Sequence, residues 1–85
     1  MIDDSHETID RAIETLSREL PPVFCRKDVP KLLGNIIAAG TLANIDSRKQ
    51  GPPRIKLKRN TAYERTSFLI WLKSYMVQQH TGVRS

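Results

Sequence analysis

The apolar side chains of the first 20 residues recur at intervals of three and four, which is the spacing of a single helix face. Ser5 can serve as the N-cap of this helix, and acidic residues occupy its first turn. Pro21-Pro22 should end it, because proline lacks an amide donor and restricts the preceding residue. We therefore predict an amphipathic helix over residues 1–20. Its apolar face contains Ile9, Ala12, Ile13, Leu16 and Leu20.

A second, shorter helix is predicted after Phe24. Cys25 occupies its N-cap position, where cysteine is a weak cap, and Gly34 marks its end. Pro30 lies beyond the first turn, where it would remove one backbone hydrogen bond. We expect this helix to be short or slightly bent. Its apolar face is made of Val29, Leu32 and Leu33.

The next apolar positions fit a third helix over residues 38–48, with residues 34–37 as the turn before it. Two helices joined by a short glycine-containing link form the helix-turn-helix pattern, provided that the second helix keeps one face exposed. Thr41, Asn44 and Arg48 are spaced three and four residues apart, so they share one face. That face lies away from the apolar side, and the segment therefore satisfies the pattern.

Residues 51–53, Gly-Pro-Pro, stop the third helix, and the pattern then changes to a period of two. Ile55 and Leu57 alternate with basic residues, which indicates a half-buried strand with a basic solvent face. Residues 58–60 are the predicted turn, and residues 61–63 are the predicted partner strand. This β-hairpin follows the helix-turn-helix in the position of a wing.

A last helix should begin at a cap formed by Thr66 or Ser67 and carry the largest apolar residues of the chain. These residues are Phe68, Leu69, Trp71, Leu72, Tyr75 and Met76. The predicted fold is mostly α with a small β-hairpin, a winged helix-turn-helix with an added N-terminal helix. The chain divides into the helix of residues 1–20, the winged domain of residues 23–76 and a flexible tail of residues 77–85.

The net charge of +5 conceals an asymmetry along the chain. Residues 1–20 carry six acidic and two basic side chains, whereas residues 48–65 carry seven basic side chains and one acidic one. Lysine and arginine bind a phosphate backbone and gain affinity from the counterions that the backbone releases. Double-stranded DNA is therefore the expected partner of the basic segment. The plain alternatives are a solubilising charged hairpin and a solvated acidic helix.

The predicted DNA contacts lie at the start of the second helix, on the third helix and on the hairpin. In a major groove, Asn44 can read adenine, Arg48 can read guanine, and Thr41 can contact phosphate or a methyl group. Arg59, at the hairpin tip, can enter a minor groove. Alternatively, Thr41 caps its helix and Asn44 braces a neighbouring backbone group. The full predicted set is Arg26, Lys27, Thr41, Asn44, Ser47, Arg48, Lys49, Arg54, Lys56, Lys58, Arg59 and Asn60.

Other residue types exclude several classes of function. The single cysteine, Cys25, cannot form an internal disulfide, and His6 and His80 lack metal-ligand spacing. Trp71 and Tyr63 fit core positions better than base-stacking platforms. Because no nucleophile, general base or metal cluster converges, we expect neither an enzyme nor a cofactor. The N-terminal stretch resembles neither a signal peptide nor a membrane span, which favours a cytoplasmic protein without membrane contact.

Taken together, these segments resemble the excisionase-like winged-helix proteins, or recombination directionality factors, of the MerR-like group. The resemblance covers residues 24–75, and its most specific parts are the Thr-Leu-Ala-Asn run at residues 41–44 and the Gly-Pro before the basic hairpin. It also includes Phe24 to Val29, Leu32 to Gly34, Ile55 to Leu57, Tyr63 and Trp71-Leu72. The resemblance implies a small DNA-binding protein of a bacteriophage or mobile element that directs or regulates site-specific DNA recombination, with an integrase or recombinase as a candidate partner.

The chain departs from the family pattern at four positions. The family usually has Ser or Thr at Cys25, Ala at Pro30, a cap such as Ser at Ala38, and Gly at Lys58. The N-terminal helix lies outside the resemblance and can pack on the domain, form a homodimer with a second copy or bind another protein. Two alternative functions therefore stay open: transcription regulation in a mobile element, and a protein-interaction module that uses the acidic helix.

Overall fold

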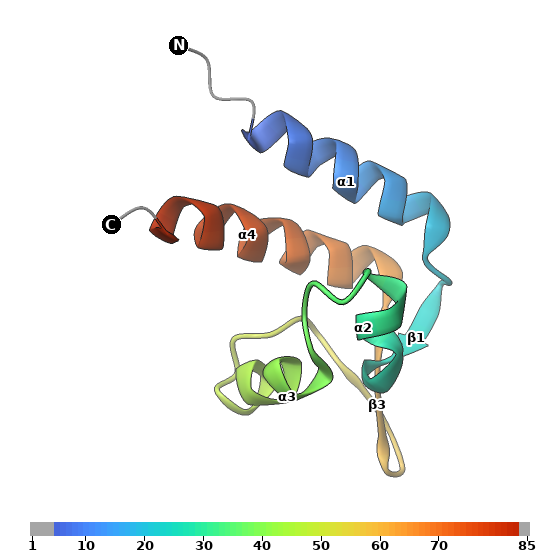
Figure 1. The fold of residues 1–85 in the computed structure, drawn as a ribbon. Coiled ribbons are helices and arrows are strands. Elements are labelled where there is room, and N and C mark those ends of the chain that lie inside the picture. Colours follow the sequence, from blue (N-terminus) through green and yellow to red (C-terminus); the bar gives the residue numbers. More distant parts are fainter. Residues whose placement is uncertain (1–4, 84–85) are drawn as a thin grey trace.

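The computed structural model describes residues 5–83, which form four α-helices, one 3₁₀ helix and a three-stranded antiparallel sheet. In chain order the elements are α1 (Ser5–Glu19), β1 (Val23–Cys25), η1 (Arg26–Asp28), α2 (Val29–Leu32), α3 (Ala39–Ser47), β2 (Ile55–Leu57), β3 (Asn60–Glu64) and α4 (Arg65–Val83). Helix α1 packs along α4, and the hairpin of β2 and β3 projects from the end of the molecule far from α1 (Figure 1). The mostly helical fold with a small antiparallel sheet was predicted from the sequence.

Helix α1 confirms the predicted N-terminal helix within the described residues. Its apolar stripe faces α4 and the core, with Ile13 and Leu16 half-buried and Leu20 buried just beyond the helix end. Two polar contacts fix the pairing of the helices: Lys73 Nζ lies 2.8 Å from Asp10 Oδ1, and Arg65 Nη1 donates a 2.9 Å hydrogen bond to the Leu20 carbonyl. The added helix therefore packs on its own domain.

The second predicted helix is short, as expected, but it starts differently. Residues 26–28 form a 3₁₀ turn, and α2 begins only at Val29, so Pro30 lies in the first turn. The expected loss of a backbone hydrogen bond at Pro30 is thus wrong, because an amide in the first turn has no intrahelical partner to lose. The helix ends in a Schellman motif, in which the amide of Asn35 donates to the Pro30 carbonyl at 2.6 Å and Gly34 adopts a φ of 66°.

Helix α3 occupies residues 39–47, one residue inside each predicted boundary. Ala38 stands at its N-cap without a side-chain hydrogen bond, as expected from alanine. Its C-terminus is a second Schellman motif, since the Gln50 amide donates to the Ile45 carbonyl at 3.1 Å. Lys49 provides the left-handed residue of this motif, with a φ of 60°.

The sheet has the strand order β1-β3-β2, and β1 was not predicted from the sequence. The register pairs Phe24 with Tyr63 and Lys56 with Thr61, which places these four residues on the face that carries Tyr63 into the core. The apolar residues of β2 therefore lie on the opposite face, where Ile55 is 39% and Leu57 is 53% exposed. The predicted half-buried strand is wrong. The alternation is present, but the hairpin extends beyond the core.

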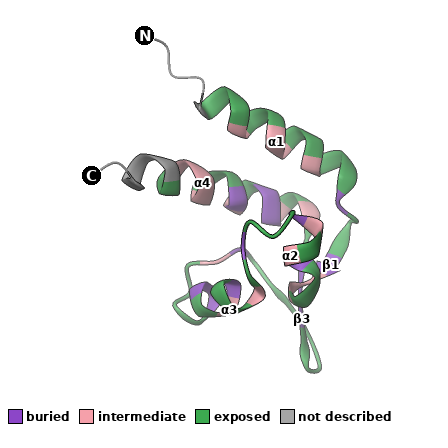
Figure 2. Ribbon diagram, viewed as in Figure 1, coloured by how far each residue is buried: buried purple, intermediate pink, exposed green. Residues whose placement is uncertain are grey.

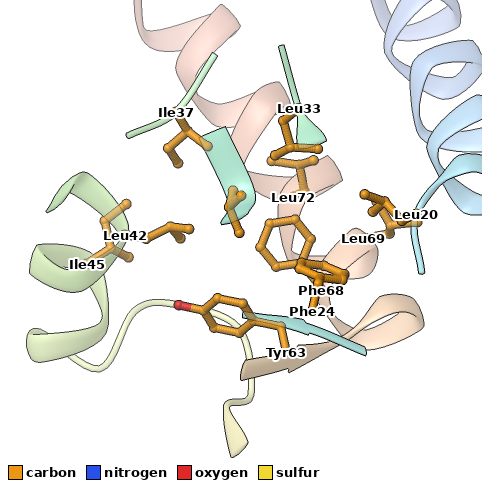
Figure 3. Packing of buried hydrophobic residues seen from close by; sticks show 11 residues of the cluster. Leu20, Phe24, Leu33, Ile37, Leu42, Ile45, Tyr63, Phe68, Leu69 and Leu72 are labelled. Atoms are coloured by element: carbon orange, nitrogen blue, oxygen red, sulfur yellow. The ribbon is translucent and has the colours of Figure 1, made fainter. Parts of the chain in front are cut away.

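The core lies between α4, the sheet and the inner sides of α2 and α3, whereas the hairpin is largely exposed (Figure 2). Phe24 and Phe68 meet edge to face with their ring centroids 5.1 Å apart. Tyr63 is fully buried beside them, and its hydroxyl points toward α3 (Figure 3). Trp71 packs half-buried against the same cluster, and its indole N–H donates to the Gln50 carbonyl at 2.8 Å. The predicted packing roles of Tyr63 and Trp71 are confirmed.

Helix α4 begins and ends differently from the prediction. Glu64, rather than Thr66 or Ser67, caps it: the Glu64 carboxylate accepts the amides of Thr66 at 2.9 Å and Ser67 at 3.0 Å. These hydrogen bonds, those of Ser67 first, lower the pKa of Glu64 to about 2. The helix continues to Val83, so most of the predicted flexible tail is helical, because no proline interrupts the chain after Met76. Residues 84–85 lie outside the described residues.

Candidate nucleic-acid interface

The tip of the β2–β3 hairpin is a two-residue loop formed by Lys58 and Arg59. Lys58 has a φ of 57°, and a positive φ at the first loop position is typical of a type II′ turn, which favours glycine there. Lys56, Lys58, Arg59 and Asn60 are all exposed. None of these three basic side chains forms an ion pair within residues 5–83. The hairpin therefore presents unpaired positive charge to solvent.

Helix α3 turns small and polar residues outward. Leu42, Ile45 and Asp46 are buried, whereas Thr41, Asn44 and Ser47 are exposed, as predicted. The side-chain amide of Asn44 makes no hydrogen bond within the described part of the chain, so it does not brace the backbone as the alternative supposed. Ala38, not Thr41, occupies the N-cap. The outer face of α3 is thus free and has no bulky apolar side chain.

A shallow pocket joins the start of α3 to the hairpin. Lys27, Ala39, Arg59 and Asn60 line it together with Arg26 and Thr61. The predicted contacts from the 3₁₀ turn and from the hairpin tip, which are more than 30 residues apart in sequence, therefore border one surface. We name the outer face of α3 and the hairpin together the basic face.

A second groove runs between α3 and α4 and changes the expected grouping of the helix residues. Thr41 and Arg48 line it opposite Trp71, Ser74 and Gln78. Arg48 is exposed, and its Nε donates a 3.4 Å hydrogen bond to the Asn44 carbonyl of its own helix. Thr41 and Arg48 thus lie on the side of α3 that borders α4, whereas Asn44 lies in the middle of the exposed face. Ser74 and Gln78 were missed in the sequence, although their spacing from Trp71 could have placed them on one side of α4.

Two further predicted contacts, Lys49 and Arg54, gather at the C-terminal end of α3. They line a small pocket with Pro52 and Pro53. Arg54 Nη1 donates a 3.1 Å hydrogen bond to the Asp46 carbonyl, which fixes the start of the hairpin against the end of the helix. Lys49 is exposed and unpaired within residues 5–83. Both side chains remain at the border of the basic face.

Arg26 borders the shallow pocket between α3 and the hairpin and also makes contacts that the sequence did not predict. Its Nη2 lies 2.7 Å from Asp46 Oδ2, its Nε donates to the Tyr63 hydroxyl at 3.1 Å, and Tyr63 in turn donates to Asp46 Oδ2 at 2.6 Å. Burial, together with the bond to Asp46, raises the pKa of Tyr63 to about 12, so the hydroxyl stays protonated and donates at neutral pH. The hydrogen bond with Tyr63 raises the pKa of Arg26, burial opposes this, and Asp46 raises it further. The guanidinium is therefore held by Asp46 and Tyr63, while the Arg26 side chain stays 23% exposed.

The acidic residues of α1 are largely neutralised by neighbours. The Arg11 guanidinium nitrogen lies 4.0 Å from a carboxylate oxygen of Glu7, and that of Arg18 lies 3.3 Å from a carboxylate oxygen of Glu14. Asp10 pairs with Lys73 of α4. All of these side chains are exposed, so each pair adds little stability. The pairs leave Glu19 as the one acidic side chain of α1 without a basic partner within residues 5–83, whereas the basic side chains of the hairpin all lack one.

Comparison of the chain with protein-family models, with curated proteins and with solved structures found no match. Within residues 5–83, no group of three or more His, Cys, Asp or Glu side chains lies close enough to hold a metal ion. None of the described helices is both long enough and apolar enough to cross a membrane.

Proposed function

We propose that the chain binds double-stranded DNA as an excisionase-like winged helix-turn-helix protein. In this account α3 enters a major groove, and the β2–β3 hairpin lies in an adjacent minor groove or along the phosphates. The observation that carries the proposal is the basic face: an unobstructed helix face beside a hairpin whose lysine and arginine side chains have no ion-pair partner within residues 5–83. A helix face without bulky apolar groups fits the groove, and unpaired cations suit phosphates.

The proposed division of labour follows from the chemistry of the two parts. The hairpin supplies affinity and orientation, because lysine and arginine contacts to phosphates carry no sequence information. Asn44 supplies sequence choice, because its free amide can pair with both the acceptor and the donor on an adenine edge. No cofactor takes part. A role in directing recombination of a phage or mobile element, together with a recombinase partner, rests on the sequence resemblance alone.

The test compares two double variants that remove the same charge from different places. Lys58→Ala with Arg59→Ala should weaken binding to every duplex by about tenfold or more and reduce the salt slope by about two. Arg11→Ala with Arg18→Ala, on α1, should change affinity less than about twofold, because these residues lie away from the basic face. Fluorescence anisotropy with a labelled duplex at several salt concentrations measures both.

The outcomes separate charge from placement. Equal weakening by both double variants would show that net charge alone attracts DNA, and unchanged binding in the hairpin variant would contradict the proposal. Asn44→Ala adds a third comparison, because it should reduce discrimination between duplex sequences by about tenfold while leaving the salt slope unchanged. Equal weakening of binding to every duplex in that variant, with discrimination retained, would assign Asn44 to phosphate contact instead.

A further inference from the structure

Asp46 is the one charged residue buried in the described part of the chain, with 2% of its surface exposed. Its carboxylate receives Arg26 from η1 and Tyr63 from β3, and it belongs to α3. One oxygen, Oδ2, thus connects η1, β3 and α3, and α3 and β3 themselves carry the basic face. Burying a carboxylate is costly unless it is fully paired, so a residue of this kind signals a specific requirement.

The surroundings of Asp46 hold it firmly. A methyl group at Gly51 would lie 2.0 Å from Asp46 Oδ1, which shows how closely the following loop packs on the carboxylate. The Asp46 carbonyl also accepts Arg54 at the start of the hairpin. Within residues 5–83, no buried side-chain nitrogen or oxygen lacks a hydrogen-bond partner. The cluster is therefore a satisfied polar contact with one arrangement, rather than a loose set of charges.

The cluster is also well placed to control the relation between α3 and the hairpin. Helix α3 packs mainly against η1, whereas β3 pairs with β1 and β2 and continues into the hairpin tip. The Tyr63 ring is anchored in the core, and its hydroxyl reaches out to α3 (Figure 3). Arg26 spans from η1 to both partners. Within residues 5–83, no other hydrogen bond or ion pair joins α3 to β3.

We infer that Arg26, Asp46 and Tyr63 form a positioning joint that holds α3 at a fixed angle to the β2–β3 hairpin and thereby sets sequence discrimination on DNA. This inference rests on the proposed function. Phosphate contacts tolerate small changes in geometry, because the Coulomb attraction between a cation and a phosphate has no preferred direction. Base reading does not tolerate such changes, since α3 must meet base edges while the hairpin occupies the adjacent minor groove or lies along the phosphates. Loosening the joint should therefore reduce discrimination more than affinity.

The experiment uses three single variants of the full chain. Tyr63→Phe removes one hydroxyl and leaves the ring in the core, and Asp46→Asn removes the charge with the side-chain shape kept. Leu16→Ala, on α1, is the matched control, because it lowers stability on the opposite side of α4 without touching the joint. If Asp46→Asn fails to fold, Tyr63→Phe carries the test.

Two readouts are needed. The first is the distance distribution between spin labels on Ser47→Cys and Arg59→Cys in a Cys25→Ser background, measured without DNA. It should broaden in Tyr63→Phe and Asp46→Asn and stay unchanged in Leu16→Ala. The second is the ratio of affinities, without labels, for a duplex selected by the parent from a random pool and for its shuffled counterpart. This ratio should fall by about tenfold in the joint variants, while affinity for the shuffled duplex changes less than about twofold.

Each outcome has a distinct meaning. Label distances as narrow as those of the parent would overturn the joint. Broadened distances with an unchanged affinity ratio would overturn its role in reading sequence. An equal fall of the ratio in Leu16→Ala would reduce the effect to general stability. If the parent itself does not discriminate between duplexes, the proposed function fails and the reading role fails with it, whereas the label distances still decide whether the joint exists.

Discussion

On the α1 side of the molecule, Glu7, Asp10 and Glu14 each face a basic partner, whereas on the α3 side Lys56, Lys58 and Arg59 face none within residues 5–83. The two sides also differ in packing. Helix α1 lies flat along α4, while the hairpin projects into solvent (Figure 1). The two sides therefore differ in where unpaired charge lies, which the net charge of +5 does not reveal.

A second difference concerns buried polar groups. The contact of α1 with α4 is apolar, with one exposed ion pair, Lys73–Asp10, at its edge. The contact of α3 with η1 contains the Arg26–Asp46 pair, in which Asp46 is buried and Arg26 is partly buried. Replacing an exposed pair costs little stability, but removing the partner of a buried carboxylate leaves an uncompensated charge in the interior. The α3 side should therefore be the more sensitive side to substitution.

The largest expected effect is on the packing around the buried Asp46 carboxylate. Gly51→Ala should lower the free energy of unfolding by about 3 kcal/mol, because the new methyl group collides with the Asp46 carboxylate. Gly40→Ala in α3 is the matched control. Nothing lies within 4 Å of a methyl group there, so it should stabilise the protein by about 0.5–1 kcal/mol through helix propensity. Urea denaturation measures both, and equal effects of the same sign would contradict the packing account.

The next effect separates stability from binding at the hairpin tip. Lys58→Gly should raise the free energy of unfolding by up to about 1 kcal/mol, because glycine relieves the positive φ of 57°. It should weaken DNA binding at the same time, because one contact charge is lost. Lys49→Gly relieves a φ of 60° at the end of α3 and should stabilise similarly, with a smaller change in binding. Thermal denaturation and anisotropy together test these opposite signs; stronger DNA binding by Lys58→Gly would count against the hairpin contact.

The smallest effect lies at Glu64, where the sheet passes into α4. Its pKa of about 2 is below the ordinary value of 4.5, so the capping contribution should be complete above pH 4.5 and disappear as the pH falls through 2. Glu64→Gln should therefore unfold at a lower temperature than the parent at pH 7, and the difference should shrink between pH 4.5 and 2. A difference that is constant over this range would show that the carboxylate charge is not what stabilises the cap.

The sequence predicted the helices well because their apolar spacing is regular, as in Ile13, Leu16 and Leu20. It did not predict β1, because three residues are too few to show a period. It also placed Ile55 on the wrong side of the hairpin, since alternation defines two faces but not which of them meets the core. That choice depends on pairing with β3, which brings residues together from distant parts of the chain.

The residues of the candidate site were likewise predictable only in part. Exposure of Asn44, Lys58 and Arg59 was predictable, because polar residues on a helix face and at a hairpin tip have no core to enter. Arg26 was expected to contact DNA, and the structure shows in addition an ion pair with Asp46 that the sequence did not predict. A signal was available: Asp46 is the only acidic residue between Val29 and Tyr63. An isolated acid in a basic segment has several candidate ion-pair partners, and the sequence does not say which of them it takes.

The central claim is that the basic face binds duplex DNA and selects among sequences. The most direct measurement is a mobility-shift titration of the parent protein with a duplex from its own genetic locus and with a shuffled duplex of the same composition, at two salt concentrations. The account predicts tighter binding to the locus duplex at both concentrations, and weaker binding to both duplexes at the higher salt. Absence of any shift at the lower salt would contradict it.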